Sequence, residues 1–130
     1  MEAANEISDE YLLGDELIDG QHRKMLTMLA TMQHLESPSE IRGMMMKLYI
    51  LVREHFFDEE ALMADRGYPQ REEHVQEHAR VLAEMDRYSK MLFGAGLSLV
   101  EIKEKLKVDV VEHLLEQDMR LGAFLQGRDV

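Results

Sequence analysis

The apolar residues of this 130-residue chain recur mainly at the three- and four-residue intervals that place side chains on one face of an α-helix. The first such series comprises Met25, Leu26, Leu29 and Met32. No stretch shows the period-two alternation of a half-buried β-strand. Leu, Met, Glu, Lys and Ala are abundant and only two prolines occur, a composition that favours helices. The pattern therefore predicts an all-α protein.

Three breaks interrupt this helical pattern. Residues 37–40 (SPSE) combine an N-cap serine, a proline at the first helical position and a glutamate three residues after the cap. Residues 67–69 (GYP) and 94–96 (GAG) stop a helix, because glycine and proline are poor continuations of one. Residues 98–101 (SLVE) repeat the capping pattern. These breaks predict four helices.

Four long helices joined by short loops favour an up-down-up-down antiparallel four-helix bundle. We expect a first helix with Asp19 as its N-cap, preceded by an extended N-terminal arm (residues 1–18) in which Gly14 marks a turn. The length fits one domain over residues 1–130, with the bundle in residues 19–126. The expected helices span about 20–36, 39–66, 70–92 and 99–126.

Charge and cysteine content exclude several classes of function. The net charge of −11 arises from 15 basic and 26 acidic residues, so the chain repels nucleic acid and anionic membrane surfaces. No apolar run approaches the roughly 18–20 residues that span a bilayer, and the acidic N-terminus does not resemble a signal peptide. The absence of cysteine excludes disulfides and thiolate metal ligands. We therefore expect a soluble, cytoplasmic protein.

Five of the six histidines and two carboxylates have spacings that bring them to one level of such a bundle. Pairs four residues apart share a helix face, as in His55 with Glu59 and His74 with His78. At about 1.5 Å per residue, both pairs lie roughly 10–18 Å from the turn at Gly67. The first and fourth helices bring their candidates to the same half of the bundle. The candidate metal ligands are His22, His55, Glu59, His74, His78, His113 and Asp118.

Five imidazoles and two carboxylates are too many ligands for one tetrahedral zinc ion. Imidazole suits iron, copper, nickel and zinc, whereas magnesium and calcium prefer oxygen ligands. Two metal ions that share both carboxylates would use this set economically, with three histidines on one ion and two on the other. The ion with two histidines then keeps an open position for a small ligand.

In order and spacing these motifs resemble the hemerythrin family, specifically bacterial hemerythrins, over residues 11–122. The matching segments are Gly14 with 18–22 (IDGQH), 55–63 (HFFDEEALM), Tyr68-Pro69, His74-x-x-x-His78 and His113-x-x-x-x-Asp118. The resemblance implies that His74, His78 and His113 bind one iron and that His22 and His55 bind the other. It further implies that Glu59, Asp118 and an oxo or hydroxo group bridge the two irons.

The implied function is reversible binding of dioxygen at the iron held by His22 and His55, for oxygen transport, storage or delivery. No catalytic residue is expected, and the chain lacks the Glu-x-x-His motif of oxidase-type di-iron bundles. Three alternatives stay open: a sensor that acts through a protein partner or homo-oligomer, an enzyme that reduces peroxide or nitric oxide, and a bundle with a vestigial site. Weak oxidase or peroxidase activity stays open as well.

Four positions need separate interpretation. Asp109 stands where the family commonly has tryptophan, so its carboxylate either faces solvent or makes the pocket wetter. Val110 replaces a family leucine and is expected to widen access to the iron. We expect His34 to be an ordinary surface histidine and Glu60 to be solvated or to support a ligand. Because five residues turn about 140° on an ideal helix, we hypothesise a π-bulge before Asp118.

Overall fold

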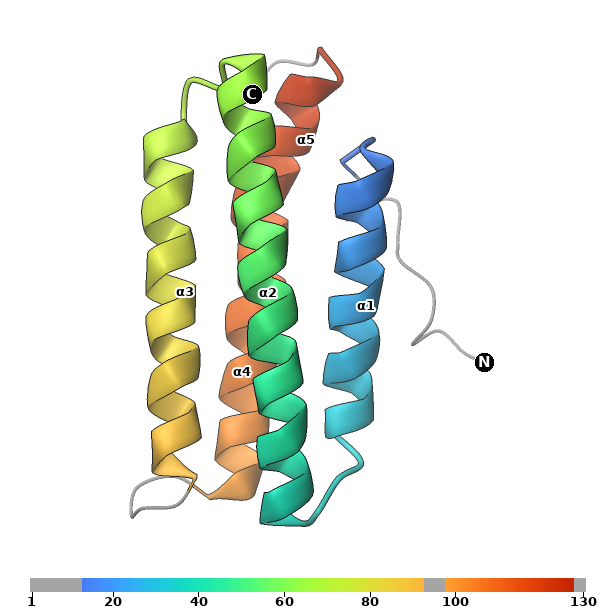
Figure 1. Cartoon of the computed structure of the whole chain (residues 1–130), viewed down its shortest axis with the longest axis vertical. Helices are drawn as coiled ribbons and strands as arrows, with labels where there is room; N and C mark the ends of the chain where they lie inside the picture. Colours follow the sequence, from blue (N-terminus) through green and yellow to red (C-terminus); the bar gives the residue numbers. More distant parts are fainter. Residues whose placement is uncertain (1–12, 93–97, 128–130) are drawn as a thin grey trace.

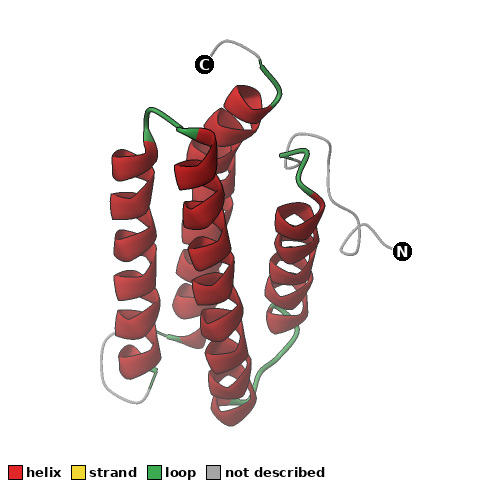
Figure 2. Cartoon of the chain, turned by 45° about the horizontal axis from the view of Figure 1, so that its top comes forward, coloured by secondary structure: helices red, strands yellow, loops and turns green. Residues whose placement is uncertain are grey.

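The computed structural model describes residues 13–92 and 98–127, and every regular element in these ranges is helical (Figure 2). Helices neighbouring in sequence pack side by side and antiparallel, with α2 in front of α4 and between α1 and α3 (Figure 1). The predicted antiparallel four-helix bundle is therefore confirmed. The elements are α1 (Glu16–Met32), α2 (Pro38–Arg66), α3 (Arg71–Met91), α4 (Leu99–His113), the π-helical turn η3 (Leu114–Asp118) and α5 (Met119–Leu125).

The start of the first helix differs from the prediction. Asp15, not Asp19, is the N-cap, and its side chain accepts a hydrogen bond from the backbone N–H of Ile18 at 3.0 Å. Both aspartates have the residue type of an N-cap, but Gly14 adopts a positive φ of 94° and turns the chain one residue before Asp15. The helix also ends earlier than predicted, at Met32. The expected arm falls largely in residues 1–12, outside the described residues.

Asp19 instead connects residues 13 and 14, which precede α1, to that helix. Its side chain is buried, and its two oxygens accept hydrogen bonds from the backbone N–H groups of Leu13 at 2.7 Å and Gly14 at 3.2 Å. Gln126, which follows α5, donates to the carbonyl of Leu13 at 3.2 Å. These hydrogen bonds hold residues 13 and 14 against the start of α1 and also hold Leu13 against the end of α5.

We expect Asp19→Ala to lower the free energy of unfolding by about 2 kcal/mol, because a buried backbone donor and a partly buried one lose a charged acceptor. Urea denaturation measures this change. The control is Arg23→Ala, an exposed position on the same helix, which should change stability by less than about 0.5 kcal/mol. Equal losses in the two variants would show that the Asp19 contacts do not stabilise the fold.

The predicted caps of the other helices are present. Ser37 caps α2 by accepting from the backbone N–H of Glu40, and Gly67 ends α2 in the left-handed conformation at φ 67°. Ser98 and Glu101 form a reciprocal capping box: the Glu101 N–H donates to the Ser98 hydroxyl at 3.2 Å, and the Ser98 N–H donates to the Glu101 carboxylate at 2.9 Å. The predicted break at 94–96 lies outside the described residues.

The single helix predicted for residues 99–126 contains one turn of π-helix between α4 and α5. A π turn makes i→i+5 hydrogen bonds and inserts one extra residue into the helical repeat. It therefore brings His113 and Asp118 toward one side, although five residues separate them. The hypothesised π-bulge is confirmed.

Two apolar clusters divide the core along the bundle. The larger cluster fills the half that contains the α1–α2 connection, and methionines such as Met25, Met45 and Met85 contribute to it. The smaller cluster surrounds Tyr68 near the α2–α3 turn and comprises Leu13, Ile18, Met63, Tyr68 and Leu121. A buried polar layer lies between these clusters. No helix within residues 13–92 and 98–127 is both long and apolar enough to cross a membrane.

Candidate metal centre

The structure brings all seven predicted ligand residues into the buried layer between the two apolar clusters. His22 lies on α1, His55 and Glu59 on α2, His74 and His78 on α3, and His113 and Asp118 at the ends of α4 and η3. Each of the seven is at most 3% exposed. His34, in contrast, is exposed after the end of α1, as expected for an ordinary surface histidine.

The donor atoms form two groups that overlap at the carboxylates. One group contains three histidines and the other contains two, and both include Glu59 and Asp118. Within each group, one nitrogen or oxygen atom per residue lies within 4.8 Å of those of the other members. The groups are His74, His78, His113, Glu59 and Asp118, and His22, His55, Glu59 and Asp118. Such an arrangement has the donors for two adjacent cations with two shared carboxylates.

Distances within the cluster place nitrogen atoms directly against carboxylate oxygens. The His74 Nε2 atom lies 2.9 Å from both Glu59 Oε1 and Asp118 Oδ1. Asp118 Oδ1 is also 3.0 Å from His113 Nε2, and Asp118 Oδ2 is 2.9 Å from His22 Nε2. Both carboxylates therefore contact histidines from more than one helix.

Several of these buried atoms have no hydrogen-bond partner despite their short contacts. Among the described residues they include the Nε2 atoms of His55, His74 and His113 and one oxygen each of Glu59 and Asp118. An unpaired buried polar group costs about 1–3 kcal/mol, so a stable fold does not collect many of them without a ligand. Cations at the centre of the cluster would satisfy these atoms together. The residues present thus fit a metal centre.

Without a cation, protons stabilise the cluster. Burial alone would lower the pKa of His74 and His113, but the adjacent Asp118 and Glu59 carboxylates outweigh it and raise the pKa to about 9 for His74 and about 10 for His113. Burial would raise the pKa of Glu59 and Asp118, but the surrounding histidines hold both pKa values well below their usual range. The layer therefore has a strong preference for positive charge between its carboxylates.

Outer hydrogen bonds orient two of the histidines. The Nδ1–H of His78 donates to Glu60 Oε2 at 2.8 Å, because a carboxylate can only accept. The Nδ1–H of His55 donates to Gln21 Oε1 at 2.9 Å, and Gln21 Nε2 in turn donates to Asp58 Oδ2 at 2.8 Å. A proton on Nδ1 leaves the Nε2 lone pair directed into the cluster, as metal ligation requires.

Glu60 thus supports a histidine and lies outside both donor groups, in line with the sequence interpretation. The role of Gln21 was not predicted. Its sequence signal is its place beside His22 in the matching segment 18–22, and its contact with His55 depends on how α1 packs against α2.

Aromatic and aliphatic side chains cover the layer of candidate ligands on the side that faces the larger apolar cluster. The Phe56 ring stacks on the His78 ring, with centroids 3.7 Å apart and planes within 6°. Val110 lines a small apolar gap beside His113, together with Phe56 and Val81. This gap is too narrow to hold a water molecule, so a small ligand that enters here needs side-chain motion. The wider access expected from Val110 is not an open channel in the structure.

Asp109 is half-buried and has a specific hydrogen-bond partner. Its Oδ2 accepts a hydrogen bond of 2.7 Å from the hydroxyl of Tyr88, a buried residue of α3. Burial and this carboxylate raise the pKa of Tyr88, so its hydroxyl stays protonated and donates. The carboxylate therefore links α4 to α3.

Comparison with known proteins agrees with this site. The family model described as the hemerythrin HHE cation-binding domain matches residues 13–125. A bacteriohemerythrin of Campylobacter jejuni subsp. jejuni serotype O:23/36 is 28% identical over 125 residues, covering 89% of this chain and 91% of the relative. A second bacteriohemerythrin, from serotype O:6 of that subspecies, is 27% identical with the same coverage. With a family match over most of its length and the buried His/Glu/Asp cluster of a cation-binding site, the chain belongs to the hemerythrin family.

Proposed function

We propose that this chain is a single-domain protein that binds two iron ions and carries or stores dioxygen reversibly. In this proposal His74, His78 and His113 hold one ion, His22 and His55 hold the other, and Glu59 and Asp118 are shared. The observation that carries the proposal is the overlap of a three-histidine and a two-histidine donor group at the same two carboxylates.

The unequal donor groups support binding of a small ligand at one ion. If each carboxylate gives one oxygen to each ion, the first ion has five protein donors and the second has four. The second ion, held by His22 and His55, therefore keeps more room for an exogenous ligand. Iron accepts such mixed imidazole and carboxylate ligation, and two Fe(II) ions held here would supply the two electrons needed for reversible uptake of dioxygen.

The protein's own contribution is to hold the donors and to exclude water. All seven side chains are buried. The Phe56 ring and the two apolar clusters cover this polar layer on both sides along the bundle. Gln21 and Glu60 orient His55 and His78. Five neutral imidazoles against two carboxylates leave the site less anionic than a carboxylate-rich one, which supports binding of dioxygen over cleavage of its O–O bond.

The visible spectrum of the chain reconstituted with Fe(II) tests this function. It should be recorded under argon, after brief exposure to air, and again under argon. The proposal predicts a charge-transfer band that appears in air and disappears under argon over several cycles. Direct conversion to a stable diferric spectrum would contradict reversible binding, and would instead favour a sensor or an enzyme that reduces peroxide or nitric oxide.

Glu60, the carboxylate that accepts a hydrogen bond from His78, gives a more specific prediction. We expect Glu60→Ala to weaken metal binding about 10- to 100-fold, because the His78 ring loses the partner that fixes its proton on Nδ1. Glu60→Gln keeps an acceptor oxygen and should weaken binding less. Competition with a chelator measures both affinities.

The matched control is Asp65→Ala, which removes an exposed carboxylate from the same helix. This variant should bind metal like the unmodified chain. If Glu60→Ala and Asp65→Ala bind metal equally well, Glu60 does not support the centre.

A further inference from the structure

Helix α2 presents a second apolar stripe on its outer surface. Its buried residues, among them Leu48, Val52 and Phe56, face the core. On the outer face Met46 is 56% exposed, Ile50 49% and Phe57 73%. Large apolar side chains that share one solvent-facing surface of a helix make that surface a candidate interaction site.

The spacing of this stripe is that of a coiled-coil seam. With Gly43 and Arg53, the outer positions follow one another at intervals of three, four, three and four residues. This is the heptad spacing that aligns one helix with a single partner helix. Nothing lies within 4 Å of a Cβ built on Gly43, so a partner can approach closely there. We call residues 43, 46, 50, 53 and 57 the outer seam.

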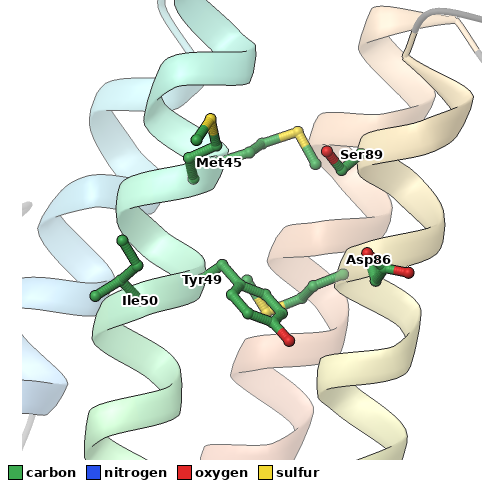
Figure 3. A pocket seen from close by; sticks show the side chains of 7 residues that line it. Met45, Tyr49, Ile50, Asp86 and Ser89 are labelled. Atoms are coloured by element: carbon green, nitrogen blue, oxygen red, sulfur yellow. The ribbon is translucent and has the colours of Figure 1, made fainter.

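A pocket opens beside the outer seam, between α2 and α3. It has a volume of about 260 Å³, and Tyr49 reaches from α2 toward α3 along its edge (Figure 3). Its lining residues are Met45, Met46, Tyr49 and Ile50 of α2 and Met85, Asp86 and Ser89 of α3. Most of this lining is apolar, so the pocket suits an apolar side chain from a partner.

We propose that the outer seam is the interface of a homodimer in which α2 packs antiparallel against α2 of a second copy. The seam has two alternating kinds of heptad position, residues 43, 50 and 57 being one kind and residues 46 and 53 the other. In an antiparallel pair each kind faces the other kind, which places Phe57 opposite Met46 and Ile50 opposite Arg53. Each protruding Phe57 then meets the mouth of the other copy's pocket, because Met46 lines it. Each copy thus contributes one protruding Phe57 and one pocket between α2 and α3, so the same contact forms twice, as a two-fold interface requires.

Charge supports the antiparallel orientation. Lys47 and Glu54 are exposed, each follows a seam residue, and both flank the outer seam on the same side. In an antiparallel pair these flanks meet, so Lys47 of each copy lies near Glu54 of the other, and two opposite-charge pairs form. A parallel pair would instead set Arg53 against Arg53. The aliphatic stem of Arg53 packs on Ile50 in the antiparallel register.

Sedimentation equilibrium of the metal-loaded 130-residue chain tests the interface. We expect a dimer whose dissociation constant rises at least about tenfold in Phe57→Ser, since the most exposed seam residue is lost. The control is Val100→Ser on α4, where the replaced side chain is 72% exposed, close to the 73% of Phe57. A chain that is monomeric at every attainable concentration, or a dimer that both variants leave unchanged, would overturn the proposal.

A charge reversal tests the orientation. Lys47→Glu alone and Glu54→Lys alone should each weaken the dimer, because each sets two like-charge pairs across the interface. The double variant Lys47→Glu/Glu54→Lys restores opposite charges and should recover the original dissociation constant. If the double variant is as weak as the single ones, α2 does not pair in the antiparallel register.

Discussion

Replacing Glu59 with alanine is expected to abolish binding of both metal ions together. Glu59 belongs to both donor groups, and its two oxygens lie fully buried among histidines from α2, α3 and α4. Its loss removes one donor from each ion and one negative charge from a layer that has only two carboxylates. We expect the affinity for iron to fall by more than about 100-fold. This loss exceeds the roughly 10- to 100-fold loss of affinity that is typical when only a hydrogen-bond partner of a metal ligand is removed. Metal content per chain after dialysis measures the result.

The histidine variants should lose metal differently. His22→Ala removes a donor only from the two-histidine group, so the chain is expected to keep one ion at the three-histidine group. His34→Ala, at an exposed position away from both groups, should keep both ions. Full metal content in Glu59→Ala would contradict the shared role of this carboxylate.

The metal-free chain is expected to lose several kcal/mol of stability as the pH rises from 6.5 to 10. The pKa of His74 and His113 is raised in the folded state, from 6.5 to about 9 and about 10. Their contribution is fully present below pH 6.5 and is lost as the pH rises through these folded-state values. One pKa unit corresponds to about 1.4 kcal/mol, so two such shifts form a large part of the stability of a small domain.

The two carboxylates act at the opposite end of the pH range. Because the pKa of Glu59 and Asp118 is lowered, their contribution is present above pH 4.5 and is lost as the pH falls below that value. The metal-free chain should therefore be most stable between about pH 4.5 and 6.5.

Bound metal should remove the alkaline loss, because ligation requires neutral imidazoles and releases their protons. Urea denaturation of the metal-free and metal-loaded chain across this pH range measures both curves. A metal-free chain that is equally stable at pH 6.5 and pH 10 would show that the carboxylates do not hold protons on His74 and His113.

Much of the fold could be predicted because the relevant signals are local. The caps at Ser37, Gly67 and Ser98 depend on residues within one turn of the helix end, and all three form as expected. The start of α1 was wrong because Asp15 and Asp19 are equivalent as caps in sequence. The choice between them depends on the packing of residues 13 and 14 against the bundle, which is a tertiary effect.

The clustering of the candidate site could be predicted because helical rise fixes the height of a side chain along a bundle. His55 and Glu59, in the second half of α2, and His74 and His78, in the first half of α3, had to lie at one level. The partners that orient these side chains could not be predicted in this way. Gln21 meets His55, and Tyr88 meets Asp109, only through the rotation of each helix about its own axis. Heights along the bundle do not determine that rotation.

The most direct test of reversible oxygen binding is the amount of dioxygen taken up and given back by the fully reduced, iron-loaded chain. An oxygen electrode can follow uptake on mixing with air-saturated buffer, and release when the sample is flushed with argon. We expect uptake of one dioxygen per two irons and its recovery as dioxygen. Uptake without recovery, with both irons left oxidised, would contradict reversible binding, because dioxygen would then have been consumed by the centre.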